Sequence, residues 1–534
     1  MSDKALQAQD NTNHTGAIAR STLIIMAGWA ASILIGLFRQ RIIAGQFGTG
    51  FEIDAFTAAN VIPELIFTML SGGALSFAFM PVYTQLMDDN NYANRLFSQV
   101  VNLIFIVTLA AAVVVVIFAP VLVKSSWGVG AEYSPEIQNL TIQLMRVLLL
   151  STILFAVSGI LTAVLYAHQH FIIPALLPSL YSAGIILGAL ILTPRFGIFG
   201  IAWGAVLGSF LHLAIQIPGI FRYKVRWIPT LALDAPVRRV AYLMAPRVID
   251  LLMARASINW LNATLSSRLG EGRLAALDFA YRLMNMPWTL IGTAIGIVVF
   301  PMMAALAAKK DVEEQRKALS GALRAILTLA IPAAVGLIFL GKPIIRLLFE
   351  GGEFTPESTE LVFYALRFYS IALISQSILE VVIRAFAAQQ DTYTPLYISF
   401  FTTLLNVGLA IWLSRPMASG GIEHGGPALA NGIAVLVEAF LGLTILSIRW
   451  KGINAKRIFL DLAKSIIAAA AMVAIILLAQ QFFSGSDLYL LVLGGGLGAA
   501  VYFIVALILG IREIKEIPIA LLRQFRIKSD EQAQ

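Results

Sequence analysis

Long apolar stretches separated by short polar gaps follow one another along this chain, from residue 21 to residue 511. A helix needs about 20 apolar residues to cross the hydrocarbon core of a bilayer. Such stretches recur at residues 17–45, 54–87, 95–123, 136–166, 174–193, 198–221, 235–267, 272–308, 315–349, 356–389, 393–414, 425–448, 459–482 and 488–511. The pattern predicts an all-α integral membrane protein with about fourteen transmembrane helices and polar tails at residues 1–16 and 512–534.

The composition agrees with a membrane protein and argues against an enzyme. Hydrophobic residues make up 59% of the chain and charged residues 13%, about half the charged fraction of soluble proteins. Cysteine is absent, which excludes disulfides and thiolate chemistry, and the five histidines are scattered. The sequence contains no Ser/His/Asp set, phosphate-binding glycine loop or HExxH motif. We therefore expect no catalysis, no cofactor and no metal site.

The net charge of +8 reflects basic gaps between the spans and not a nucleic-acid-binding face, so we expect no nucleic-acid partner. Basic residues gather after the sixth span, after the twelfth span and in the C-terminal tail: Arg222, Lys224, Arg226, Arg238, Arg239, Arg449, Lys451, Lys456, Arg457, Lys464, Arg512, Lys515, Arg523, Arg526 and Lys528. Acidic residues gather after the ninth span: Glu350, Glu353, Glu357 and Glu360. Because short cytoplasmic loops are enriched in lysine and arginine, both termini are expected in the cytoplasm.

Three pairs of similar segments indicate an internal duplication. Asp54 precedes a proline by nine residues, and so does Asp278. The segment AHQHFIIP resembles AQQDTYTP, and GIAWGAV resembles ALANGIA. The three pairs lie 224, 221 and 228 residues apart, in the same order along both halves.

The duplication predicts two lobes of six helices each. The N-lobe comprises residues 17–221 and the C-lobe residues 235–448, and helices thirteen and fourteen at 459–511 have no counterpart. An even number of spans gives both copies the same orientation, so they form parallel repeats. Transporters built in this way hold their substrate between the two halves.

Ionisable side chains inside the spans are the main functional signal, because such groups face a cavity or a polar pathway. They are Arg39, Arg41, Glu64, Arg146, Arg247, Asp250, Arg255, Arg282, Arg367, Glu380 and Arg384. Arg41 is equally compatible with an interfacial anchor, and Glu380 with a local ion pair to Arg384, one helical turn away. For Arg282, the only close acidic neighbour in the sequence is Asp278. Arginine forks at Arg39, Arg255 and Arg282 favour an anionic head group, especially a pyrophosphate.

Several long motifs resemble those of a known family. They are GLFRQRIIAGQFGTGFEIDAFTAANVIPELIF, GGALSFAFMPVY, LDFAYRLMNMPWTLIGTAIGIVVFP, LFEGGEFTPEST and RAFAAQQDTYTP. They are similar to the MurJ (MviN) lipid II flippases, within the multidrug, oligosaccharidyl-lipid and polysaccharide exporter superfamily. The resemblance implies fourteen helices, two lobes around a cationic cavity, and a groove for a lipid tail between helices thirteen and fourteen. Arg39, Asp54 and Arg282 match the family's charged positions on helices one, two and eight.

The chain departs from the family pattern at several positions. Ile33, Phe67 or Thr68, and Gly72 stand where well-known members carry two arginines and an acidic residue. Asn262 and Asn406 match the carboxylates of a sodium site that some members have. We therefore expect no sodium coupling in this chain.

These observations favour a flippase that moves lipid II, or a related undecaprenyl-pyrophosphate glycolipid, across the bacterial cytoplasmic membrane by alternating access. Substrate contacts are expected from Arg39, Arg282, Arg255 and Asp54, and gating or ion pairing from Asp278, Glu380 and Arg384. Two alternatives stay open. One is an exporter of another polyprenyl-linked saccharide or a drug, and the other is a non-transporting scaffold in wall synthesis. A monomer surrounded by membrane lipids is expected, with the cell-wall synthesis machinery as a further partner.

Overall fold

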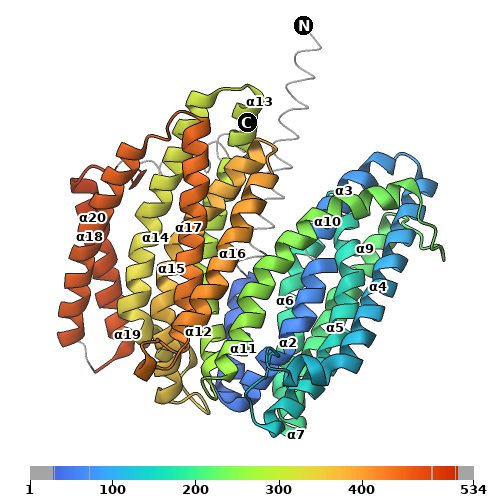
Figure 1. Ribbon diagram of the computed structural model, residues 1–534, viewed down its shortest axis with the longest axis horizontal. Coiled ribbons are helices and arrows are strands. Elements are labelled where there is room, and N and C mark those ends of the chain that lie inside the picture. The colour runs from blue at the N-terminus through green and yellow to red at the C-terminus, as the bar shows by residue number, and fades with distance from the viewer. Residues whose placement is uncertain (1–27, 29–30, 71–72, 483–484, 512, 515–534) are drawn as a thin grey trace, which may run out of the picture. The chain divides into compact units, whose positions relative to one another are not determined.

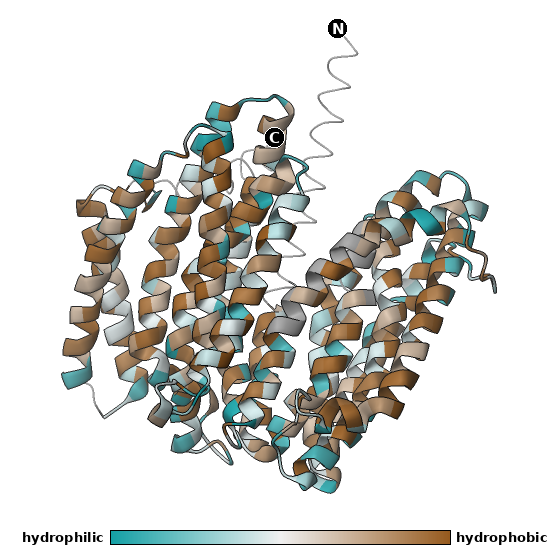
Figure 2. Ribbon diagram, in the orientation of Figure 1, coloured by the Kyte–Doolittle hydropathy of each residue, from teal (hydrophilic) through white to brown (hydrophobic). Residues whose placement is uncertain are grey.

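The computed structural model describes residues 28, 31–70, 73–482, 485–511 and 513–514, and these are almost entirely helical (Figure 1). Within them, eleven helical segments are long and apolar enough to cross a membrane. Figure 2 shows hydrophobic residues along the helices and hydrophilic residues concentrated at the connecting loops. The structure therefore confirms the all-α membrane class.

Three of the fourteen expected spans do not correspond to one of these eleven segments. Most of the span at 17–45 lies outside the described residues, although residues 31–47 are helical. The span at 54–87 corresponds to two shorter helices that flank residues 71–72. The span at 235–267 carries several charged residues and contains a π-helical turn. The tails at 1–16 and 515–534, and Gly72, also lie outside the described part of the chain.

The chain divides into two compact units after Glu271. In unit 1, helix α5 packs against α2, α4 and α8, and α6 packs against α8. The helices of unit 1 are α2 (Phe51–Leu70), α3 (Gly73–Leu86), α4 (Asn90–Lys124), α5 (Pro135–Ala167), α6 (Ile172–Leu187), η1 (Gly188–Leu192), α7 (Thr193–Phe196), α8 (Phe199–Ala214), α9 (Ile217–Arg222), α10 (Ala235–Arg255), η2 (Ala256–Trp260) and α11 (Leu261–Ser267).

The unit boundary differs from the expected lobe boundary between residues 221 and 235. Helix α10 belongs to unit 1 because its apolar side chains Val237, Val240 and Met244 are buried with those of α3 and α4. The preceding loop is also held on α4, where Asn94 and Ser98 accept hydrogen bonds from its backbone N–H groups. Packing of the helix thus places residues 235–271 with the N-terminal unit.

In unit 2, α15 packs against α12, α14 and α17. Helix α18 packs against both α14 and α20. Helix α20 is also bonded to α14, because the Tyr502 hydroxyl of α20 donates to the Thr328 carbonyl of α14 at 2.7 Å. The helices of unit 2 are α12 (Arg273–Trp288), η3 (Thr289–Thr293), α13 (Ala294–Ala308), α14 (Val312–Phe349), α15 (Pro356–Ala388), α16 (Tyr393–Leu413), η4 (Met417–Ser419), α17 (Gly425–Arg449), α18 (Ala455–Phe482), α19 (Asp487–Tyr489), η5 (Leu490–Gly495) and α20 (Gly496–Ile508).

Helices α5 and α15 have matching boundaries, which supports the duplication. Both contain 33 residues and begin with proline, and their starts and ends are each 221 residues apart. A hydroxyl caps each N-terminus, from Ser134 in one case and Thr355 in the other, and satisfies a free backbone N–H. Beyond each C-terminus, Gln169 and Gln390 have left-handed φ angles of 55° and 60°. The two glutamines lie in the segments AHQHFIIP and AQQDTYTP, which are paired by their sequence similarity.

Candidate functional site

Arg39 lies in the helical segment 31–47 of unit 1 and is half-buried. Its Nη1 donates to the Ser182 hydroxyl of α6 at 3.3 Å. The neighbouring Arg41 is exposed. The side chain of Arg39 is therefore held against a second helix, as expected for a guanidinium with a positional role, whereas the exposure of Arg41 fits an interfacial anchor.

Asp54 is fully buried in the first turn of α2. Tyr133, in the loop between α4 and α5, lies close enough for the Asp54 charge to raise its pKa, after the larger effect of burial. A carboxylate near a helix N-terminus is favoured by the aligned backbone dipoles. In this conformation Asp54 is shielded from solvent. Its buried place in the first turn suits a residue that holds the N-terminal end of α2 in position.

Arg255 is the last residue of α10, directly before the π-helical turn η2. Its side chain lies outside the part of the structure that is described. The same holds for Arg247 and Asp250 on this helix.

On α12 of unit 2, Arg282 and Asp278 form the predicted pair. The Arg282 Nε lies 2.7 Å from the Asp278 Oδ2, and the two side chains are 47% and 24% exposed. The carboxylate binds one edge of the guanidinium. Nearly half of the Arg282 side chain is exposed, so the guanidinium is only partly removed from water.

Glu380 and Arg384 on α15 form the predicted local ion pair, at 3.1 Å. The Thr293 hydroxyl of η3 also donates to Glu380, at 3.5 Å. A Cβ atom at Gly296 of α13 would lie 2.4 Å from the Arg384 Nε, so the Arg384 side chain packs directly against this glycine and would have to shift for a larger residue. The ion pair therefore joins α15 to the segment around η3, which supports a structural or gating role.

The two asparagines at the sodium-site positions lie in different units. Asn262 on α11 is half-buried, and Asn406 on α16 is 5% exposed. Among the described residues, no group of three His, Cys, Asp or Glu side chains could hold a metal ion. The expectation that sodium coupling is absent is not tested by this geometry.

Sequence reasoning missed Glu438, an intramembrane carboxylate on α17. It accepts a hydrogen bond from the Thr402 hydroxyl of α16 at 3.3 Å. A lone glutamate in the apolar run AVLVEAFLGL was the signal that could have identified it.

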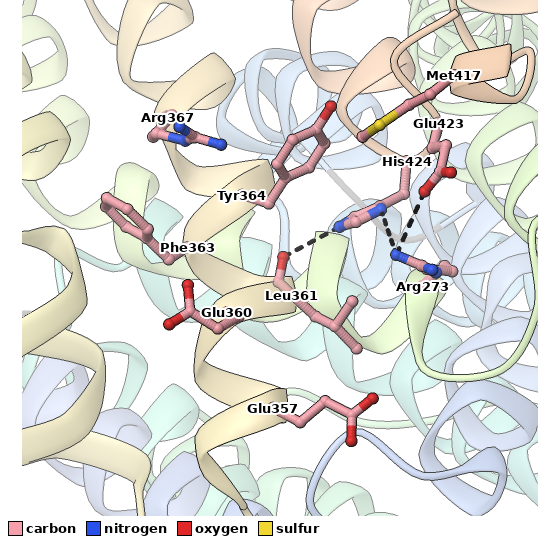
Figure 3. A pocket seen from close by; sticks show the side chains of 10 residues that line it. All are labelled: Arg273, Glu357, Glu360, Leu361, Phe363, Tyr364, Arg367, Met417, Glu423 and His424. Atoms are coloured by element: carbon pink, nitrogen blue, oxygen red, sulfur yellow. Dashed lines mark hydrogen bonds and ion pairs between the residues drawn. The ribbon is translucent and has the colours of Figure 1, made fainter.

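A cavity of about 290 Å³ lies where α12, α15 and α17 begin (Figure 3). The ring of His424, 1% exposed, forms one wall. Its Nε2 lies 3.0 Å from the Leu361 carbonyl and its Nδ1 lies 3.2 Å from the Arg273 Nη1, which also pairs with Glu423 at 3.5 Å. Arg367, expected deep in the membrane, is exposed and lines this cavity.

Comparison with known proteins agrees with the sequence resemblance. The family model described as "Lipid II flippase MurJ" matches residues 43–493. A lipid II flippase MurJ of Burkholderia cenocepacia is 27% identical over 444 residues, covering 81% of this chain and 84% of that protein. A probable lipid II flippase MurJ of Thermotoga maritima is 28% identical over 501 residues, covering 93% and 98%.

The fold is shared with solved structures of the wider superfamily. A structure titled "Lipid II flippase MurJ, inward closed conformation" matches with a TM-score of 0.78 and 24% identity, over 93% of this chain and 99% of that chain. An inward-facing multidrug resistance transporter of the MATE family matches with a TM-score of 0.67 and 18% identity, over 79% and 94%. Because the family model spans most of the sequence, this chain belongs to the lipid II flippase MurJ family.

Proposed function

We propose that this protein moves lipid II, a lipid-linked peptidoglycan precursor, across the bacterial cytoplasmic membrane. The observation that carries the proposal is the family match over residues 43–493, whose curated relatives are named as lipid II flippases. The protein acts as a carrier by alternating access and catalyses no covalent step. It works as a monomer, since one duplicated chain supplies both halves.

The half-exposed arginine of α12 supplies the chemistry that such a cargo requires. A pyrophosphate carries about two negative charges, and moving it through a bilayer requires replacement of its hydration shell. The Arg282 guanidinium is held by Asp278 and is nearly half exposed, and a guanidinium is the side-chain group best suited to bind phosphate oxygens. A partly hydrated arginine performs this exchange at a lower desolvation cost than a fully buried one.

Unit 1 contributes Arg39 and Asp54 in this proposal. Arg39 is positioned by Ser182 and supplies a second guanidinium, while the buried Asp54 acts as a positioning residue at the α2 end. Arg255 is assigned a substrate contact because it matches the intramembrane charge pattern. Glu380 and Arg384 serve as an ion pair that couples α15 to η3 and α13 during gating.

We assign the lipid tail of the cargo to the two C-terminal helices. α18 and α20 both present apolar side chains on their exposed faces, among them Ile466, Leu477, Ile504 and Ile508. Both termini are placed in the cytoplasm on the basis of the basic gaps, and the cell-wall synthesis machinery is the expected partner.

A second candidate function is the export of another polyprenyl-linked saccharide. It is favoured by Ile33 and by Phe67 or Thr68, which stand where the family resemblance leads us to expect arginines. A thinner set of guanidinium groups would suit a cargo with less charge in its head group.

Replacement of the cell's own flippase distinguishes the two functions. Wild-type protein expressed in a bacterium whose lipid II flippase is depleted should sustain growth and wall synthesis. If the cells lyse although the protein accumulates in the membrane, lipid II transport is contradicted and the saccharide exporter becomes the better account.

A further inference from the structure

Arg367 is an available cation at the cavity shown in Figure 3. Its guanidinium carbon lies 5.4 Å from the ring centre of Phe363 and 5.1 Å from that of Tyr364, so two aromatic faces support it. Within the described residues, no carboxylate forms an ion pair with it. The N–H groups of its fork are therefore available to an anionic ligand.

The other polar groups of the cavity are held in place by internal contacts. Arg273 binds Glu423 and His424, and Glu360 is paired with Lys342. The Tyr364 hydroxyl donates to the Ile422 carbonyl at 3.2 Å. Because these partners fix α12, α15 and the loop before α17 together, the cavity is preorganised, which lowers the entropic cost of binding.

The charges and the size of the cavity select the kind of anion. Two arginines face three glutamates, Glu357, Glu360 and Glu423, so a doubly charged phosphate is disfavoured. A single carboxylate accompanied by a cationic group suits Arg367 and the exposed Glu357 together. The volume of about 290 Å³ lies near the lower limit of ligand sites and fits the last residues of a chain.

We propose that this cavity binds the free carboxyl terminus of a short basic peptide, with Arg367 as the carboxylate-binding group. The apolar side chains of Leu361 and Met417 contact the small side chains of the terminal residues. The site is formed within unit 2 alone. Peptide binding is measured without transport, and only the assignment to a cargo peptide rests on the proposed function.

Two sources can present this chemistry, and the stereochemistry of the peptide separates them. A peptide carried by a wall precursor ends in D-residues, whereas the C-terminus of a partner protein ends in L-residues. Purified full-length protein in detergent is titrated with fluorescently labelled Lys-Ala-Ala in four forms: the D,D acid, the L,L acid and the C-terminal amide of each. Fluorescence anisotropy reports binding.

We expect saturable binding of at least one acid. The amides and the Arg367→Gln variant should bind about tenfold to a hundredfold more weakly, because one charge-assisted hydrogen-bond pair is lost. Arg367→Lys should bind with intermediate affinity, and the exposed Arg457→Gln, far from the cavity in sequence, should equal wild type. Preference for the D,D acid assigns the site to the cargo peptide, and preference for the L,L acid to a partner protein.

Two outcomes would overturn the proposal. One is that neither acid binds to protein whose melting temperature shows it to be folded. The other is that acid and amide bind equally, or that Arg367→Gln binds like wild type. Because Arg367 is exposed, its substitution is not expected to disturb folding.

Discussion

The ring of His424 is held between two polar partners that fix its protonation state. Its Nδ1 accepts from Arg273, so its Nε2 carries the proton and donates to the Leu361 carbonyl. A second proton would bind at Nδ1 and would place a positive charge next to the Arg273 guanidinium in a buried site. Burial, with the Arg273 charge, lowers the pKa of His424 from 6.5 to about 4, although the bond to Leu361 opposes the shift.

This histidine predicts a pH dependence of stability. Between pH 6.5 and about 4 the unfolded chain binds this proton while the folded chain does not, so stability falls as the pH is lowered through that window and is complete above it. From pH 7.5 to 5 the loss is on the order of 2 kcal/mol. Melting curves in detergent should show a smaller loss for His424→Gln than for wild type. Equal pH dependence of the two proteins would contradict this assignment.

Single residues were predicted well where their partner lies one helical turn away. The pairs Asp278–Arg282 and Glu380–Arg384 follow from spacing along a single helix. The partners of His424 and Glu438 come from other helices, so they could not be predicted from the spacing of residues along one helix. The interaction of Asp54 with Tyr133 likewise involves a loop that is distant in sequence.

Among the packed helices, glycines form a close contact between α6 and α8 in unit 1. A Cβ atom at Gly184 of α6 would lie 2.2 Å from the Gly208 Cα of α8, and one at Gly188 would lie 2.4 Å from the Gly204 Cα. Small residues four apart let two membrane helices approach to backbone contact. Because the atoms in contact belong to the backbones, a side chain at either glycine would require the two helices to move apart.

We expect Gly184→Ala to destabilise the protein by about 1–3 kcal/mol, because overpacking forces the two backbones apart. The matched control is Gly336→Ala in α14, where a Cβ atom meets nothing within 4 Å. The melting temperature in detergent should fall for the first variant and not for the second. Equal melting temperatures would mean that the α6–α8 interface tolerates the added methyl group.

The apolar pattern predicted most membrane segments, because span length is set by bilayer thickness. It could not assign α10 to a unit, since its apolar residues pack on α3 and α4 while its sequence position suggests the second lobe.

At the scale of the whole molecule, the account predicts transport without sodium coupling. Amides at Asn262 and Asn406 supply no negative charge to offset the dehydration of a cation. Lipid II movement in proteoliposomes should therefore proceed equally in sodium and in choline buffers at a fixed membrane potential. A clear increase with sodium under those conditions would show that another carboxylate, such as Glu438, completes a cation site.

The central claim is that guanidinium groups carry the head group of the cargo, and complementation of a flippase-depleted strain tests it most directly. We expect Arg39→Ala and Arg282→Ala each to abolish growth while membrane expression stays near that of wild type. Lysine at either position should restore growth only in part, because it keeps the charge but loses the bidentate fork. Arg457→Ala, at an exposed arginine in the first turn of α18, is the control and should support growth.

The contradicting result is equally clear. If both alanine variants support full growth at wild-type expression, Arg39 and Arg282 are interfacial anchors and the cationic head-group site does not exist.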